Sequence, residues 1–298
     1  MPAVLNTNAA SLYASKNLQN AQAKMASSVE RLSSGLRVNR AKDDAAGLGI
    51  ATSLTSQING SNQGIRNLND GISIVQTAEG AIGAAMEMGQ RILTLSTQGA
   101  NESLGSNERN SIQNEMRQLI TAIDSISSRT NFTNTPLFMN ATNGTTTITL
   151  QASNVTGDII TLAAGAFIKL GTNGEASSGA SSAATIGQAA ALNTAINAAA
   201  SGLSTAQMNS IRTAATSFVT ALTTQRGLLG AYQNQIEYSV SNLTELSSNL
   251  SAARSNVVDT DYATETASLT KGQILQQAAT AMLAQANQMP NVILSLLK

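Results

Sequence analysis

The amino-acid sequence predicts a mainly α-helical protein, organised as a long antiparallel helical rod or coiled coil that carries a small β-hairpin. Apolar residues recur at steps of three, four and seven along both flanks of the chain, which is the spacing of helices packed on other helices. A segment rich in Thr, Ala, Gly and Ser separates the flanks, and two short runs within it alternate as strands do. We therefore expect the flanks to build the rod and the middle to build the hairpin.

The N-terminal flank predicts a short helical stretch followed by a very long one. Through the first 36 residues, apolar side chains follow a seven-residue repeat and its adjoining row: Leu18, Met25, Leu32, Val29 and Leu36. The apolar series then continues from Ile50 to Leu93. Residues 45–100 as a single helix would be about 85 Å long at 1.5 Å per residue, which indicates a rod. A further helix is expected over about residues 107–129.

Nine glycines within residues 45–100 leave two interpretations open. A glycine in a helix interior costs roughly 0.5–1 kcal/mol relative to alanine, so close packing must offset that cost if the helix is continuous. Alternatively some glycines mark breaks, and Asn69-Asp70-Gly71 has the composition of a turn. The apolar period nevertheless runs straight through this tripeptide.

The middle of the chain and the C-terminal flank complete the prediction. The run TTTITLQ at 145–151 alternates with period two, and DIITL at 158–162 follows a turn-like segment, so we expect a β-hairpin at 145–162. A short variable segment is expected near residues 171–190, and a short helix at about 185–200. Helical spacing then resumes from Ile211 and continues to the last apolar residues of the chain.

Composition excludes several classes of function. The chain has no His and no Cys, which rules out a Cys nucleophile, a His base and a zinc site with His or Cys ligands. Asp43 and Asp44 are adjacent, and adjacent helical residues point in different directions, so they do not form an acid–base pair. Lys plus Arg equals Asp plus Glu at 17 each, with no basic stripe for nucleic acid. The sequence contains no run of 18 apolar residues, so it predicts no segment that inserts into a membrane. We expect no enzyme, catalytic residue, metal or cofactor.

Short motifs at both ends carry the most specific information. They are NTN (6–8), ERLSSGLR (30–37), AKDDAAG (41–47), NDGISI (69–74), TAEGA (77–81), SAAR (251–254), DYATE (261–265), ILQQA (274–278), LAQANQ (283–288) and LSLL (294–297). In these motifs and their order, the chain resembles bacterial flagellin, the subunit of the flagellar filament. The resemblance covers roughly the first 140 and the last 70 residues.

The resemblance implies an architecture. Residues 1–44 would pair with 255–298 as an inner coiled-coil domain in the filament core, and 45–254 would form an outer helical rod domain. The middle of the chain is short, so the outer globular domains of larger relatives would be missing or vestigial. The implied self-assembly core comprises Leu18, Met25, Val29, Leu32, Leu36, Ile274, Leu275, Met282, Leu283, Leu294, Leu296 and Leu297. The alternative is that these apolar stripes form an ordinary intramolecular bundle.

The resemblance also implies a function. The chain would be a structural subunit that self-assembles into the extracellular flagellar filament for swimming motility. Its start does not read as a Sec-type signal peptide, and the family is exported unfolded through the flagellar type III apparatus. The terminal segments would order on assembly. Implied partners are further copies of the chain, hook-associated and cap proteins, and an export chaperone. The alternative is a hook–filament junction protein that does not polymerise indefinitely.

Two further groups of residues follow from the resemblance. An inter-domain or intersubunit junction would contain Arg31, Arg37, Lys42, Asp43 and Asp44, either as intersubunit ion pairs or simply as a solvated face. A face read by the animal flagellin-sensing Toll-like receptor would contain Gln90, Arg91, Leu95, Gln98, Glu115 and Gln118. Thr94 and Leu119 depart from the family pattern beside that face. The alternative role of these residues is packing within the filament.

Overall fold

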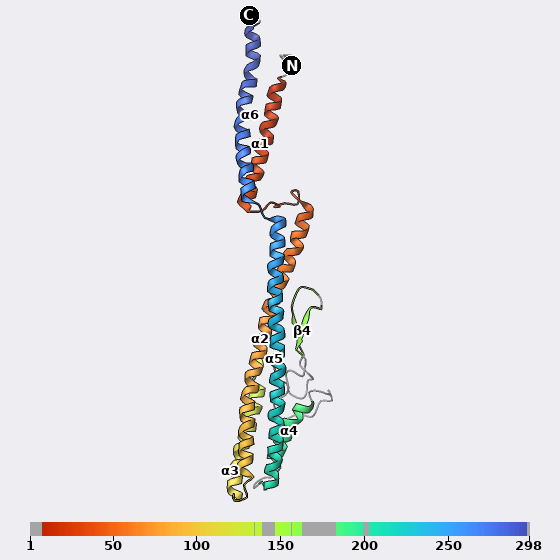
Figure 1. Ribbon diagram of the computed structural model, residues 1–298, viewed down its shortest axis with the longest axis vertical. Helices are drawn as coiled ribbons and strands as arrows, with labels where there is room; N and C mark the ends of the chain where they lie inside the picture. The colour runs from red at the N-terminus through yellow and green to blue at the C-terminus, as the bar shows by residue number, and fades with distance from the viewer. Residues whose placement is uncertain are drawn as a thin grey trace. The chain divides into compact units, whose positions relative to one another are not determined.

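The computed structural model describes residues 8–133, 135–138, 147–155, 157–162, 183–198 and 203–296 (Figure 1). Over these residues the chain forms six helices and two small antiparallel strand pairs, which confirms the mainly α-helical fold with a β-hairpin. The helices are α1 (Ala9–Ser34), α2 (Ala45–Gly99), α3 (Ser106–Arg129), α4 (Ala183–Ile196), α5 (Thr205–Val258) and α6 (Tyr262–Leu296). The strands are β1 (Asn131–Phe132), β2 (Thr135–Pro136), β3 (Ile148–Gln151) and β4 (Ile159–Leu162).

The chain divides into two compact units, one comprising Met1–Ile58 with Ser248–Lys298 and the other Asn59–Ser247. The divisions therefore lie inside α2 and α5, whereas the sequence analysis places them at 44/45 and 254/255. The first turns of α2 and the last turns of α5 join the first unit because they share a small apolar cluster with the loop after α1. Its buried members are Val38, Ala51 and Val258.

In the first unit, α1 and α6 run antiparallel and side by side (Figure 1). At one end, the Asn8 amide donates to the Ala286 carbonyl oxygen at 2.7 Å. The side-chain oxygen of Asn8 also accepts from the Ser11 backbone N–H at 3.1 Å, so Asn8 caps α1. At the other end, Gly35 terminates α1 with a left-handed φ of 71°, which glycine adopts without strain.

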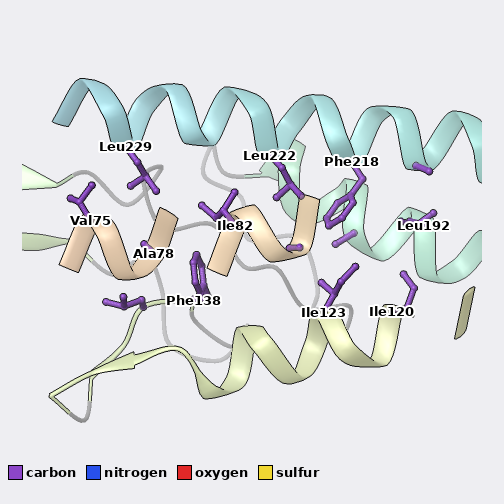
Figure 2. Packing of buried hydrophobic residues seen from close by; sticks show 14 of the residues in the cluster. Val75, Ala78, Ile82, Ile120, Ile123, Phe138, Leu192, Phe218, Leu222 and Leu229 are labelled. Carbon is purple, nitrogen blue, oxygen red and sulfur yellow. The ribbon is translucent and has the colours of Figure 1, made fainter. Parts of the chain in front are cut away.

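In the second unit, α2 and α5 run antiparallel, since residues later in α2 contact residues earlier in α5. The Ser247 hydroxyl donates to Asn62, and Arg226 forms an ion pair with Glu79 at 3.0 Å. Figure 2 shows the core between these helices, α3 and α4. Its labelled members are Val75, Ala78 and Ile82 from α2, Phe218, Leu222 and Leu229 from α5, Ile120 and Ile123 from α3, Leu192 from α4, and Phe138, which follows β2.

The predicted hairpin is confirmed, and it lies on α2. Strand β3 pairs antiparallel with β4, and alternate residues such as Leu150, Ile160 and Leu162 are buried. Helix α2 continues through residues 69–71, so the turn interpretation of that tripeptide is wrong. A side chain at Gly71 would overlap Leu150, so the absence of a side chain there admits the hairpin.

The short β1–β2 pair was not predicted. Its strands have two residues each, too few to display an alternating pattern. Helix α4 occupies most of the range expected to be helical at 185–200, whereas residues 171–182 of the variable segment lie outside the described residues.

Candidate self-assembly surface

Small residues form the contact between α1 and α6. On α1 the buried positions are spaced by seven residues, at Ala14, Ala21 and Ser28. On α6 the same spacing buries Gly272, Ala279 and Ala286. A methyl group added at Gly272 would lie 3.5 Å from the Cβ of Met25, an ordinary van der Waals distance. The seven-residue repeat is therefore present, but it is a seam of small side chains.

The large apolar side chains of the predicted self-assembly core are not the fully buried residues of that seam. Val29, Ile274, Leu275 and Met282 are between 44% and 65% exposed. The remaining predicted members with described side chains are half-buried, at Leu18, Met25, Leu32, Leu36 and Leu283. The side chains of Leu294 and Leu296, and all of Leu297, lie outside the described residues. A surface with this many exposed large apolar side chains is typical of an interaction site.

Sequence reasoning missed two exposed apolar residues on α1, Leu12 and Tyr13, of which Tyr13 is 71% exposed. They precede the first repeat of large residues, so the heptad pattern did not include them. Tyr13 alone offered a signal, because four tyrosines and four phenylalanines are the only aromatic residues of the chain. We use the name inner face for six exposed large apolar residues of α1 and α6 taken together: Leu12, Tyr13, Val29, Ile274, Leu275 and Met282.

A groove of about 720 Å³ lies between α1 and α6. Tyr13, Leu275 and Met282 of the inner face line it, together with alanines of the seam and several amide side chains. Lys24 is the one charged residue among its lining. A groove of this composition suits an apolar ridge of another helix.

Away from the loop that follows α1, the charged residues of α1 and α6 are all positive. Over residues 9–29 and 266–296 the charged residues are Lys16, Lys24 and Lys271, with no Asp or Glu. The Asp and Glu residues of the first unit all lie within 30–44 and 259–265. A like surface docked here would therefore rest on apolar contact and amide hydrogen bonds rather than on ion pairs.

Two of the predicted junction residues tie segments together: Arg31 links α1 to the start of α6, and Arg37 links the loop after α1 to the end of α5. Arg31 forms an ion pair with Glu265 at 3.5 Å, and Arg37 donates from its guanidinium to the Val257 carbonyl oxygen at 2.5 Å. The Arg37 backbone N–H also donates to Val258 O at 2.6 Å. These bonds accompany a β-bridge between Leu36 and Asp259, so two backbone segments are fastened together here.

The acidic junction residues act on the backbone of their own segment. Asp43 accepts from the Arg40 backbone N–H at 3.0 Å, and Asp44 accepts from the Gly47 N–H at 2.8 Å. Asp44 thereby caps the start of α2, as a carboxylate at a helix N-terminus does. Lys42 is exposed. Sequence reasoning missed the ion pair at 2.6 Å between Glu30, near the end of α1, and Arg40 in the loop after it.

Asp261 caps the start of α6. Its carboxylate accepts from the Thr264 hydroxyl at 2.7 Å and from the Ala263 backbone N–H at 2.9 Å. The hydrogen bond from the Thr264 hydroxyl, followed by those from the backbone N–H groups, lowers the pKa of Asp261 below its ordinary value of 3.8. The motif DYATE therefore has a structural role at the beginning of α6.

Five of the six residues of the predicted receptor face are exposed, and one is buried. Gln90, Arg91, Gln98, Glu115 and Gln118 are exposed on α2 and α3. Arg91 donates twice to one Glu115 oxygen, at 2.6 and 2.9 Å, and so links the two helices. Leu95 departs from this arrangement. It is 2% exposed and belongs to the core of the second unit, because it lies on the side of α2 that packs inward.

The described residues contain neither a metal-binding cluster nor a helix that could cross a bilayer. No group of three or more His, Cys, Asp or Glu side chains there could hold a metal ion. Among the helices of that part of the chain, none has a stretch both long and apolar enough to cross a bilayer.

Comparisons with known proteins agree over both flanks. The family model of the bacterial flagellin N-terminal helical region matches residues 5–143, and that of the C-terminal helical region matches residues 212–297. The "Flagellar filament 33 kDa core protein" of Treponema phagedenis is 36% identical, over 99% of this chain and 100% of its own length. The "Flagellin" of Halalkalibacterium halodurans is 35% identical over 99% of this chain and 100% of its own length.

A solved structure has a similar fold. A putative flagellar hook-associated protein from Vibrio parahaemolyticus superposes with a TM-score of 0.54, covering 73% of this chain and 100% of that one. At 14% sequence identity, this likeness concerns the fold alone. The two family models and the end-to-end relatives, by contrast, match in sequence, and on that ground the chain belongs to the bacterial flagellin family.

Proposed function

We propose that this chain is a structural subunit of the bacterial flagellar filament and that it assembles through the inner face. The observation that carries the proposal is the placement of large apolar residues. Small residues satisfy the contact between α1 and α6, and the inner face is left open to solvent. Burying a large apolar side chain contributes roughly 1.5–3 kcal/mol, so several such residues per copy can drive association.

The inner face argues against the alternative of a self-sufficient intramolecular bundle. A bundle that served only this chain would place its large apolar residues at the seam, where they exclude most water. Here the seam positions hold Ala, Gly and Ser instead. Further copies of the same chain are the partners we propose for the inner face.

The remaining parts follow the same proposal. Residues 1–44 and 255–298 form the filament core, and 45–254 form its outer part. The junction residues Arg31 and Arg37 fix the loop between them, which leaves Lys42 for contact with a neighbouring copy. The chain leaves the cell through the type III apparatus with the help of an export chaperone, and it meets hook-associated and cap proteins in the extracellular flagellum. Its role is structural rather than enzymatic.

We also propose that Gln90, Arg91, Gln98, Glu115 and Gln118 form the surface that the flagellin-sensing Toll-like receptor contacts. Exposure of all five side chains and the Arg91–Glu115 link, which fixes α2 against α3, support this role. Because Leu95 lies in the core, we assign it a packing role beneath that surface.

Seeded assembly tests the filament role. Purified chain at neutral pH is seeded with short filaments and examined by negative-stain electron microscopy and by sedimentation. We expect long filaments from the unchanged chain. The double substitution Ile274→Gln and Leu275→Gln should raise the concentration needed for assembly by at least about tenfold, because two apolar contacts per copy are lost.

A matched control separates the inner face from apolar exposure in general. Val155 is also exposed, but it lies in the turn of the β3–β4 hairpin in the second unit. Val155→Gln should assemble as the unchanged chain does. If the unchanged chain formed only short capped rings or stayed monomeric, a hook–filament junction role would replace the filament role.

A further inference from the structure

Methionine carries all the sulfur of this chain, since it has nine methionines and no cysteine. Six methionine side chains are described. Met116 and Met208 are fully buried, whereas Met25, Met86 and Met88 are half-buried. Met282 differs from these five because it is 65% exposed. Oxidants reach an exposed thioether most readily, so Met282 is the most susceptible of the six.

Oxidation of Met282 would affect binding because of where its side chain lies. It lies on α6 between the seam residues Ala279 and Ala286, and it lines the groove between α1 and α6 with Leu275 and Tyr13. Its thioether is thus part of the inner face but not of the seam. A change at this sulfur would alter what the inner face can bind while leaving the contact between α1 and α6 in place.

We propose that Met282 is a modification site, at which a peroxide forms methionine sulfoxide and thereby blocks assembly of the chain. A lone pair of the sulfur attacks one oxygen of hydrogen peroxide, and the O–O bond breaks. A sulfur–oxygen bond forms, and the second oxygen leaves as water after proton transfer. The thioether is oxidised by two electrons and the peroxide is reduced, so no further reactant is needed.

The consequence for assembly follows from polarity. A sulfoxide oxygen is a strong hydrogen-bond acceptor. Tyr13, Leu275 and alanines line the groove with Met282, and amide side chains and Lys24 lie along the same groove. Packed against the apolar ridge of a second copy, the sulfoxide oxygen would lose its water and gain no donor from that copy. Burial of this kind is unfavourable, so an oxidised copy would be excluded from the growing assembly. Once a copy is assembled, its inner face is covered and the sulfur is protected. This inference rests on the proposed filament function.

The test begins with free chain treated with hydrogen peroxide, in which peptide mass spectrometry locates each sulfoxide. Met282 should be oxidised before the buried Met116 and Met208, and the concentration needed for seeded assembly should rise at least about tenfold. Methionine sulfoxide reductase should restore assembly. In filaments treated with the same dose, Met282 should be oxidised much more slowly than in the free chain.

Variants assign the effect to one sulfur. Met282→Leu is compared only with its own untreated sample, and its assembly should not change on oxidation although its other methionines still react. Met86→Leu, a half-buried methionine of the second unit, should keep the response of the unchanged chain. An equal loss of assembly in oxidised Met282→Leu would overturn the inference, as would normal assembly of chain carrying sulfoxide at Met282. Failure of the untreated, unsubstituted chain to assemble would instead overturn the filament function and this inference together.

Discussion

At the scale of single residues, two aspartates and a glycine of the first unit fix helix ends. Asp44 begins α2, Asp261 begins α6 and Gly35 ends α1. Such caps satisfy backbone groups that a helix end leaves without partners, and each fixes where a helix starts or stops. The loop after α1 therefore has a defined conformation at the point where α1 and α5 end and α2 and α6 begin.

The cap at Asp261 predicts a pH dependence. Its folded pKa is lowered, mainly by the Thr264 hydroxyl, so its contribution to stability is present above its unfolded pKa of about 3.8. That contribution is lost as the pH falls through the lower folded pKa. In an acid titration of assembled protein followed by circular dichroism, the unchanged chain should lose helix more steeply below about pH 4 than Asp261→Asn.

The control for this titration is Asp70→Asn, which removes an exposed carboxylate in the middle of α2. Its titration should match that of the unchanged chain. If the curves for Asp261→Asn and the unchanged chain coincide, Asp261 does not couple protonation to the stability of α6.

At the scale of elements, glycines decide how the hairpin meets α2. A side chain at Gly64 would overlap the carbonyl group of Ala152, and one at Gly60 would lie 2.7 Å from the Asn154 side chain. Asn67 donates to the Gln151 carbonyl oxygen at 3.0 Å in the same contact. The glycines therefore admit the hairpin backbone, and the amide fixes its position.

Alanine substitution at two glycines of α2 should change the free energy of unfolding in opposite directions. Gly64→Ala forces the helix and hairpin apart, and overpacking of this kind costs about 1–3 kcal/mol in the free energy of unfolding. Outside the adjacent backbone of its own helix, Gly80 has no neighbour within 4 Å of where a Cβ would lie. Gly80→Ala should therefore stabilise by roughly 0.5–1 kcal/mol through helix propensity. Thermal unfolding measures both. Shifts of the same sign would contradict the hairpin contact.

The sequence predicts the helices well because periodicity records which residues share a face. It does not record which neighbour covers that face. The apolar repeat of Leu18, Met25 and Leu32 and the repeat of Ala14, Ala21 and Ser28 both have seven-residue spacing, and the heptad rule favours the larger residues. Only the packing of α1 on α6 identifies the small residues as the seam. The sequence placed Leu95 with exposed residues for the same reason, since spacing alone does not distinguish a buried row of side chains from an exposed one.

At the scale of the whole molecule, the inner face and the proposed receptor surface belong to different units. Assembly through the inner face therefore need not cover the receptor surface. If filament packing also uses Arg91 and its neighbours, free chain should activate receptor-reporter cells more strongly than an equal mass of filament. Equal activity would show that the surface stays accessible in the filament.

The single substitution Arg91→Ala tests the same surface in free chain. It removes both the guanidinium and the link to Glu115, and loss of a central arginine typically costs 1–2 kcal/mol, or about a tenfold loss of potency. Arg66→Ala removes another exposed arginine of α2 and should leave potency unchanged. If both variants retained full potency, the receptor would not read this surface.

The seam of α1 and α6 has a geometric consequence. Interhelical distance depends on the side chains at the contact, and Ala, Gly and Ser bring two helix axes to the short end of the usual range. In the filament that we propose, a pair of this kind takes up little cross-section, so neighbouring copies can lie close together.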